Sequence, residues 1–174
     1  MDIGQFQVYT GDGKGKTTAA LGLALRACGA GLRVYIGQFI KKGDFSEIKA
    51  LRQMIGVTVE QYGSGRGLLV RREADEADRA CARAGCDRLT AALTGGDYDV
   101  VIADEINCAI TCGLLSQDDL LALVDRRPAN VELVFTGRGA AQAVLDKADL
   151  VTEMRAVRHY FTDKGLPARE GIEM

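Results

Sequence analysis

The sequence predicts an α/β protein with a mainly parallel central sheet, on the basis of three observations. Segments with strand and helix character alternate along the chain, which is typical of parallel sheets. A glycine-rich turn at residues 10–18 joins the first strand to the first helix, and a later apolar strand ends in Asp104-Glu105. The 174 residues, of which 47% are hydrophobic, can bury a sizeable core, so we expect one domain over residues 1–174.

The first half of the chain is predicted to hold three strands and two helices. β-prone residues mark the strands, strong helix formers follow the glycine-rich turn, and Ser46-Glu47 begins a second helix. The loop at residues 63–67 is predicted to be flexible and to lie near phosphates bound at the strand ends. The predicted strands are 6–9, 33–40 and 57–62; one predicted helix contains 19–25 and ends near Gly29 or Gly31, and the other runs from Ser46 to Gly56.

The second half continues the alternation with three helices and three strands. Small and apolar residues recur at roughly helical spacing from residue 71 to residue 93, which predicts a long helix that covers the sheet. The segment from Ser116 to Asp119 resembles a capping box and begins a helix towards Arg127. The remaining predicted strands are 98–103, 131–135 and 150–157, with a tight turn at 136–139 and a helix at 140–148.

Charge and hydropathy exclude two classes of partner. The formal net charge is −2, and the pairs Arg71-Arg72 and Arg126-Arg127 are isolated, so we expect no nucleic acid to bind. No apolar run approaches the roughly 20 residues that a membrane span needs, and the chain begins almost directly with a strand. We therefore expect a cytoplasmic protein that does not bind membranes.

The cysteines and the single histidine give no sign of a metal or nucleophile site. No Cys-x-x-Cys pair is present, and an odd number of cysteines argues against a disulfide framework, so buried free thiols are the favoured interpretation. His159 has no acid or nucleophile beside it in sequence, and we interpret it as a surface or packing residue. The five cysteines are Cys28, Cys81, Cys86, Cys108 and Cys112.

The glycine-rich turn, TGDGKGKTT, is predicted to bind phosphate. Glycines let successive backbone N–H groups point inward, the helix N-terminus adds its dipole, Lys16 supplies a positive charge, and Thr17 can offer its hydroxyl to Mg²⁺. Thr10 stands where the P-loop pattern has its first glycine, but the strand–turn–helix context favours phosphate binding over an accidental Gly-Lys-Thr. The predicted phosphate-binding residues are Gly11, Asp12, Gly13, Lys14, Gly15, Lys16, Thr17 and Thr18.

Two further strand ends carry candidate residues for the same site. A P-loop site needs a carboxylate at the end of an apolar strand to hold magnesium, and Asp104-Glu105 stands at such an end. The sequence does not decide which of the two acids contacts the ion. Arg138, between two glycines at another strand end, is predicted to reach the phosphate chain. Together these signals predict a three-layer P-loop NTPase fold of the RecA-like kind.

The sequence resembles the ATP:corrinoid adenosyltransferases of the P-loop type. The resemblance rests on several blocks in one order, which together span most of the chain, and the Thr-led loop agrees with that family's own loop. The blocks are TGDGKGKTTAALGLALRACGAG, VYIGQFIKKG, VVIADEIN, RRPANVELVFTGRG, DLVTEMRAVRHYF and a closing GIE.

The resemblance implies transfer of the 5′-deoxyadenosyl group of ATP to the cobalt(I) of a reduced corrinoid, with release of triphosphate. Cobalt(I) is then the nucleophile, so no protein nucleophile or general base is required. The implied catalytic residues are Lys16, Thr17, Glu105 and Arg138, and the implied magnesium ligands are Thr17, Asp104 and Glu105. Gln38 joins the implied nucleotide-binding set, and the loops at 38–43 and 63–69 are expected beside the corrinoid.

The resemblance also implies a homodimer, an unidentified reductant and a nucleotide bound in reversed sense relative to other P-loop proteins. Two features depart from the family. Bacterial members usually have a helical extension before the first strand, which this chain lacks, so we expect a different closure of the site. Family members often place aromatic residues, including Trp, in the loop after the third strand; here Leu68, Leu69 or Val70 is the candidate to replace them against the corrinoid.

Two other functions remain open on the sequence alone. A P-loop ATPase or small-molecule kinase would release ADP, but the sequence shows no positioned acid or Gln for activating water or a hydroxyl. A non-catalytic module that binds both ATP and a corrinoid would yield no triphosphate, although the presence of Lys16, Thr17 and Asp104-Glu105 favours catalysis.

Overall fold

The predicted parallel sheet is confirmed. A computed structural model describes residues 2–66 and 73–173 and contains a six-stranded, all-parallel sheet in the order β3-β2-β4-β5-β1-β6. The candidate corrinoid contacts Leu68, Leu69 and Val70, and the Arg71-Arg72 pair, lie outside the described residues. The strands are β1 (Phe6–Thr10), β2 (Val34–Gln38), β3 (Val57–Gln61), β4 (Val100–Asp104), β5 (Glu132–Thr136) and β6 (Leu150–Glu153).

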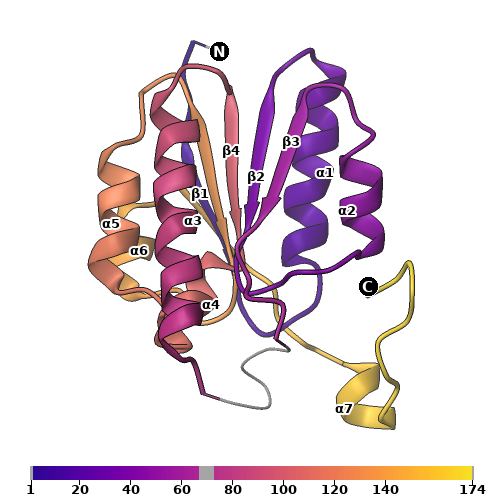
Figure 1. Ribbon diagram of the computed structural model, residues 1–174. Helices are drawn as coiled ribbons and strands as arrows, with labels where there is room; N and C mark the ends of the chain where they lie inside the picture. Colours follow the sequence, from indigo (N-terminus) through magenta and orange to yellow (C-terminus); the bar gives the residue numbers. More distant parts are fainter. Residues whose placement is uncertain (1, 67–72, 174) are drawn as a thin grey trace.

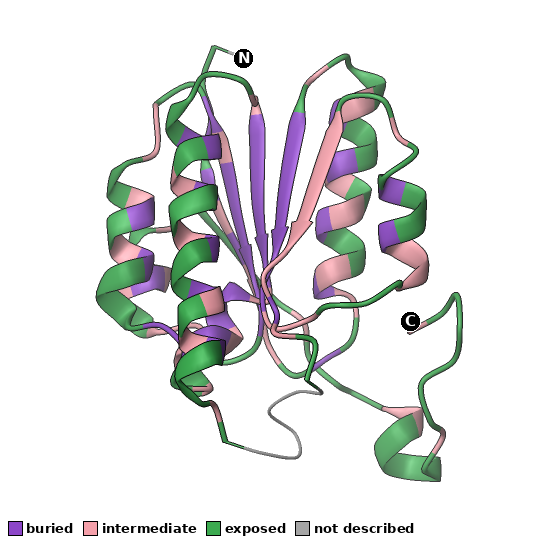
Figure 2. Cartoon of the chain, viewed as in Figure 1, coloured by how far each residue is buried: buried purple, intermediate pink, exposed green. Residues whose placement is uncertain are grey.

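Helices cover both faces of this sheet and complete the three layers (Figure 1). α1 (Lys16–Gly29) and α2 (Ser46–Leu51) lie on one face, and α3 (Glu76–Thr94), α4 (Ile106–Thr111) and α5 (Gln117–Asp125) lie on the other. α6 (Gln142–Lys147) packs beside α5, and α7 (Tyr160–Lys164) stands away from the sheet. Figure 2 shows the buried residues concentrated along the strands and on the inward faces of the helices.

The two faces of the sheet have separate apolar cores because side chains alternate along each strand. In β4, Val100 and Ile102 pack with α1 and α2, whereas Val101 and Ala103 pack with α3, α4 and α5. All five residues of β4 are buried, as expected for a central parallel strand covered on both sides. The strand that ends in Asp104 is therefore fixed by packing on both faces.

Several predicted boundaries were wrong. The long helix begins at Glu76 rather than residue 71, because the Asp75 side chain accepts a hydrogen bond from the Asp78 N–H in a reciprocal capping box. The helix from Ser46 ends at Leu51, before Gly56, and the last strand ends at Glu153, before residue 157. Two short helices, α4 and α7, were not expected from the sequence.

The last strand ends early because the chain turns towards the P-loop. The Met154 N–H donates to the Thr10 carbonyl at 2.8 Å, and the Met154 carbonyl accepts from the Gly13 N–H at 2.7 Å. Residues after Glu153 therefore leave the sheet and lie against the loop that follows β1.

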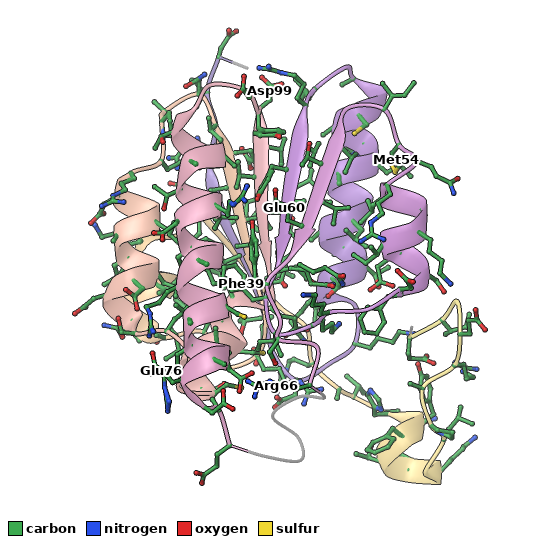
Figure 3. The ribbon with its side chains drawn as sticks, viewed as in Figure 1. Phe39, Met54, Glu60, Arg66, Glu76 and Asp99 are labelled. Atoms are coloured by element: carbon green, nitrogen blue, oxygen red, sulfur yellow. The ribbon has the colours of Figure 1, made fainter. Side chains whose placement is uncertain are left out.

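The candidate functional residues gather at the carboxyl ends of the strands. Figure 3 shows the two ends of the sheet: Asp99 lies near the amino ends, and Phe39 and Arg66 lie towards the carboxyl ends. β5 lies between β1, which leads into the P-loop, and β4, which ends in Asp104. In the part of the chain that the structure describes, no helix is long and apolar enough to cross a bilayer.

Candidate active site

The glycines of the P-loop serve two purposes. Gly15 has φ 122° and immediately precedes α1, and Gly11 has φ 94°; both values lie in the region that favours glycine. A Cβ on Gly11 or on Gly13 would lie 2.4 or 2.7 Å from the Met154 carbonyl oxygen. The close approach of the C-terminal segment thus requires two of the glycines that the sequence analysis assigned to phosphate binding.

Lys16 lies at the floor of the loop. Its side-chain ammonium donates to the carbonyl oxygens of Gly11 at 2.6 Å and Gly13 at 2.7 Å, and the residue is only 7% exposed. Burial lowers the pKa of Lys16, and the nearby Glu105 carboxylate opposes that shift. The lysine is held in the loop that lines the candidate phosphate site.

Asp104 is the centre of a buried polar network. Its Oδ1 accepts hydrogen bonds from the Thr17 hydroxyl at 2.8 Å and the Thr136 hydroxyl at 2.7 Å. Its Oδ2 accepts from the Gln38 amide at 3.1 Å, and the Gln61 amide in turn donates to Gln38 at 2.8 Å. Asp104 is 1% exposed, so these donors stabilise a carboxylate that is almost entirely removed from solvent.

Gln38 lies behind the cavity and is not part of its described lining. It is 2% exposed and lies behind Asp104. The sequence analysis placed it in the nucleotide-binding set, whereas in the structure it contacts the carboxylate that binds Thr17.

Glu105 differs from Asp104 in both backbone and surroundings. Its φ is 60°, a left-handed conformation that is unusual outside glycine, and its N–H donates to the Thr136 hydroxyl at 2.9 Å. This turn separates the two acids: Asp104 lies among buried partners, and Glu105 lines the cavity. Strained backbone of this kind is concentrated at functional sites.

Arg138 and Glu105 are linked by a thiol that the sequence analysis missed. The Cys108 Sγ donates to Glu105 Oε2 at 2.9 Å and accepts from the Arg138 N–H at 3.2 Å. Burial raises the pKa of Cys108 to about 12, so the thiol stays protonated and can donate. The only sequence signal for this contact was the position of Cys108, three residues after Glu105. All five cysteines are free thiols, and each is half-buried rather than fully buried as predicted.

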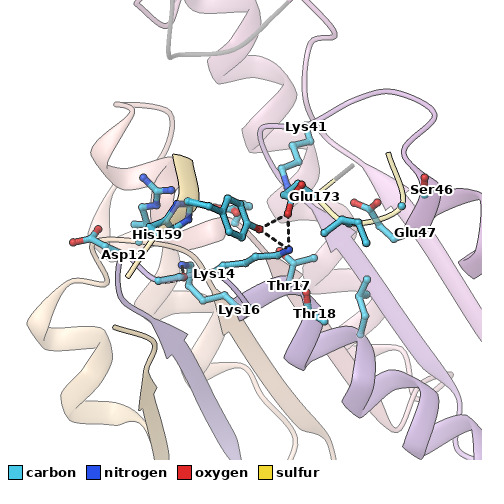
Figure 4. A pocket seen from close by; sticks show the side chains of 18 residues that line it. Asp12, Lys14, Lys16, Thr17, Thr18, Lys41, Ser46, Glu47, His159 and Glu173 are labelled. Atoms are coloured by element: carbon cyan, nitrogen blue, oxygen red, sulfur yellow. Dashed lines mark hydrogen bonds and ion pairs between the residues drawn. The ribbon is translucent and has the colours of Figure 1, made fainter. Parts of the chain in front are cut away.

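These residues surround a cavity of about 510 Å³ (Figure 4). The P-loop, Glu105 and Arg138 form part of its lining, and Lys41, Ser46 and Glu47 extend the lining on the side of α2. The C-terminal segment supplies the remaining wall, so His159, predicted as a surface or packing residue, is half-buried and lines the cavity. From that segment the lining residues are His159, Tyr160, Gly171, Ile172 and Glu173.

The described parts of the two loops that were expected beside a corrinoid, residues 38–43 and 63–66, lie together. The Gly63 N–H donates to the Lys41 carbonyl at 3.3 Å, and a Cβ on Gly63 would lie 2.3 Å from the Ile40 carbonyl oxygen. Ile40 itself has φ 68°, another left-handed non-glycine residue. Lys41 connects this loop pair to the cavity.

Oxygen atoms in the cavity lining and directly behind it are of the kind that magnesium prefers. The Thr17 hydroxyl and the carboxylates of Asp104 and Glu105 are hard ligands. Across the described residues, no group of three or more His, Cys, Asp or Glu side chains forms a ready metal cage.

The fold and this constellation define a P-loop nucleotide-binding protein. The glycine-rich loop precedes α1, and its Lys16 and Thr17 lie at the floor of the cavity. The buried Asp104 ends β4, which is separated from β1 in the sheet by β5 alone. The family model of the ATP:corrinoid adenosyltransferases BtuR/CobO/CobP matches residues 2–174, so the chain belongs to that family.

Individual relatives cover most of the chain. The corrinoid adenosyltransferase of Pseudomonas aeruginosa is 35% identical over 170 residues, which cover 98% of this chain and 83% of that protein. The corrinoid adenosyltransferase CobA of Salmonella typhimurium is 35% identical over 166 residues, covering 95% and 83%. An uncharacterised protein of Nostoc sp. is 38% identical over 169 residues, and this chain spans only 45% of its length.

Proposed function

We propose that this chain transfers the 5′-deoxyadenosyl group of ATP to the cobalt(I) of a reduced corrinoid and releases triphosphate. The observation that carries the proposal is the family match over residues 2–174, which includes every residue of the cavity. In this reaction the cobalt electron pair forms a bond to the ribose 5′ carbon. The bond from that carbon to the phosphate oxygen breaks, and its electron pair leaves with the triphosphate.

The cavity is suited to stabilising such a leaving group. Lys16 lies in the loop, and Arg138 follows β5; both line the cavity, so both cations can approach a bound phosphate chain. Backbone N–H groups of the P-loop and the N-terminus of α1 add to the attraction for an anion. These groups act by position and charge, which is what the reaction requires of a protein whose substrate supplies the nucleophile.

Thr17, Asp104 and Glu105 are the residues that would hold magnesium. When bound, magnesium would neutralise charge that accumulates on the triphosphate. Asp104 orients the Thr17 hydroxyl through their 2.8 Å hydrogen bond, and Cys108 holds the Glu105 carboxylate. The loops around Lys41 and Gly63 are proposed to face the corrinoid, because Lys41 lines the cavity and the Gly63 N–H donates to the Lys41 carbonyl.

An external reductant that generates cobalt(I), a homodimeric assembly and a cytoplasmic location complete the proposal. The reductant and the dimer rest on the family resemblance of the sequence, whereas the location rests on its hydropathy, since no apolar run approaches the length of a membrane span. Size-exclusion chromatography with light scattering measures the assembly directly, and a monomer at micromolar concentration would contradict that part.

Anaerobic incubation with Mg-ATP and chemically reduced cobalamin tests the proposed reaction. We expect the absorbance of the corrinoid to change to that of an alkylated form, and to change again on illumination because light splits the cobalt–carbon bond and leaves cobalt(II). ADP formation with an unchanged corrinoid would instead indicate an ATPase or kinase. Binding of both substrates without any product would indicate a non-catalytic module.

A further inference from the structure

The C-terminal wall of the cavity is held to the P-loop by a charged cluster. Glu173, on this wall, accepts a hydrogen bond from the Lys14 ammonium at 2.8 Å, and the Tyr160 hydroxyl also donates to Glu173. Figure 4 shows Glu173 and Lys14 joined in this way within the cavity. The contact joins residues that are 159 positions apart in the chain.

Arg169 adds a second cation to the same carboxylate. Its side chain donates to Glu173 through Nη2 at 3.1 Å and Nε at 3.2 Å. The ring of Tyr160 lies 5.8 Å from the Lys14 ammonium and 5.1 Å from the Arg169 guanidinium, so its face is near both charges. Together these donors hold the pKa of Glu173 well below its usual range, and the side chain is a carboxylate at neutral pH.

Glu173 alters the charge that a phosphate chain meets in the cavity. Among the described lining residues, four are basic and four are acidic, so their formal charges cancel when His159 is neutral. Lys14 is one of the four bases, and its ammonium is already paired with Glu173. The basic residues are Lys14, Lys16, Lys41 and Arg138, and the acidic residues are Asp12, Glu47, Glu105 and Glu173.

We propose that Glu173 is a specificity-determining residue that makes this cavity select magnesium-bound triphosphate over the metal-free anion. The inference rests on the proposed function and concerns its phosphate site. Metal-free triphosphate must compete with Glu173 for Lys14 and adds its whole charge to a cavity without net positive charge. The magnesium-bound form carries less negative charge and depends less on Lys14.

Calorimetric titration with inorganic tripolyphosphate, with and without magnesium at low ionic strength, tests this selection. Glu173→Gln keeps the size of the side chain and removes its charge. We expect the variant to bind metal-free tripolyphosphate at least about threefold more tightly than wild type, and the gain to shrink as salt is added. The affinity for the magnesium-bound form should change less.

Two control variants separate the charge of Glu173 from a general change in the C-terminal segment. Glu170→Gln removes an exposed acid from the same segment, three residues away and outside the cavity lining, and should leave both affinities unchanged. Adding Glu173→Gln to Lys14→Gln should give a smaller gain than Glu173→Gln gives in the wild-type protein, because part of the proposed effect acts through the released lysine.

The opposite result would identify Glu173 as a simple tether. If Glu173→Gln leaves metal-free binding unchanged or weakens binding with and without magnesium alike, the proposed selection is wrong. Failure of the wild-type protein to bind tripolyphosphate even with magnesium would overturn the phosphate site itself, and the proposed function with it. Normal binding without corrinoid adenosylation would contradict the proposed function alone.

Discussion

The floor of the cavity, meaning Lys16 and Thr17 with the Asp104 network behind them, is built differently from its C-terminal wall. At the floor, Lys16 and Asp104 are 7% and 1% exposed, and carbonyl, hydroxyl and amide groups hold them. At the wall, the side chains of Lys14 and Glu173 are 40% and 16% exposed, and α7 contains no buried residue. The floor is therefore fixed by the core of the sheet, whereas the wall depends on ion pairs that salt and pH can weaken.

Removing the floor lysine should have the largest effect. We expect Lys16→Ala to lower the rate of adenosyl transfer at least about a hundredfold, because a cation aimed at the departing triphosphate is lost. Lys49→Ala, on the exposed side of α2, is the matched control and should keep wild-type turnover. Steady-state rates with Mg-ATP measure both variants, and wild-type activity in Lys16→Ala would refute the assignment of the site.

Breaking the hydrogen bonds of the floor should lower the stability of the whole protein. Thr136 donates to Asp104 and accepts from the Glu105 N–H, and it is fully buried. Thr136→Val keeps the shape and removes both bonds, so we expect the free energy of unfolding to fall by about 1 to 3 kcal/mol. Urea denaturation measures the change; Thr94→Val, at an exposed helix end, should cost much less, and equal losses would contradict a special role for the floor.

Acidification should weaken the ion pairs that hold the wall. The pKa of Glu173 is depressed in the folded state, so its stabilising contribution is present above about pH 4.5 and is lost as the pH falls through the lower, folded-state value. Hydrogen exchange of residues 160–173, corrected for the intrinsic rate at each pH, should then increase. Glu173→Gln should show the faster exchange already at neutral pH, and equal protection of the two proteins at neutral pH would argue against the ion pairs as the main tether.

Removing the thiol that links Glu105 and Arg138 should have the smallest effect. We expect Cys108→Ala to lower the turnover rate by about threefold, because a single uncharged donor to the Glu105 carboxylate is lost. Cys108→Ser supplies another donor and should recover much of the rate, whereas Cys112→Ala should behave as wild type. Equal rates in all three variants, measured at saturating Mg-ATP, would show that the thiol does not position Glu105.

The same comparison explains what the sequence could predict. The floor is encoded locally: the loop, its lysine and threonine, and the acid at the end of an apolar strand are short patterns with known geometry. Their meeting follows from the parallel sheet, whose carboxyl ends lie on one edge. What the sequence left open, the separate positions of Asp104 and Glu105, depends on the left-handed backbone of Glu105, which has no pattern of its own.

The wall could not be predicted because it depends on contacts between distant residues. Lys14 and Glu173 are 159 positions apart, and no pattern in either local sequence pairs them. α7 is five residues long and buries none of them, so it lacks the periodic apolar face that marks a helix. The glycines at positions 11 and 13 were predicted for phosphate binding alone, whereas the turn of Met154 against the loop also requires them.

The identity of the phosphate product tests the central claim most directly. A single turnover with Mg-ATP and reduced cobalamin, followed by phosphorus NMR, shows which bond of ATP has broken. The proposed reaction breaks only the bond at the ribose 5′ carbon, so triphosphate should form in equal amount to the adenosylated corrinoid. ADP or free phosphate, together with an unmodified corrinoid, would contradict adenosyl transfer in this cavity.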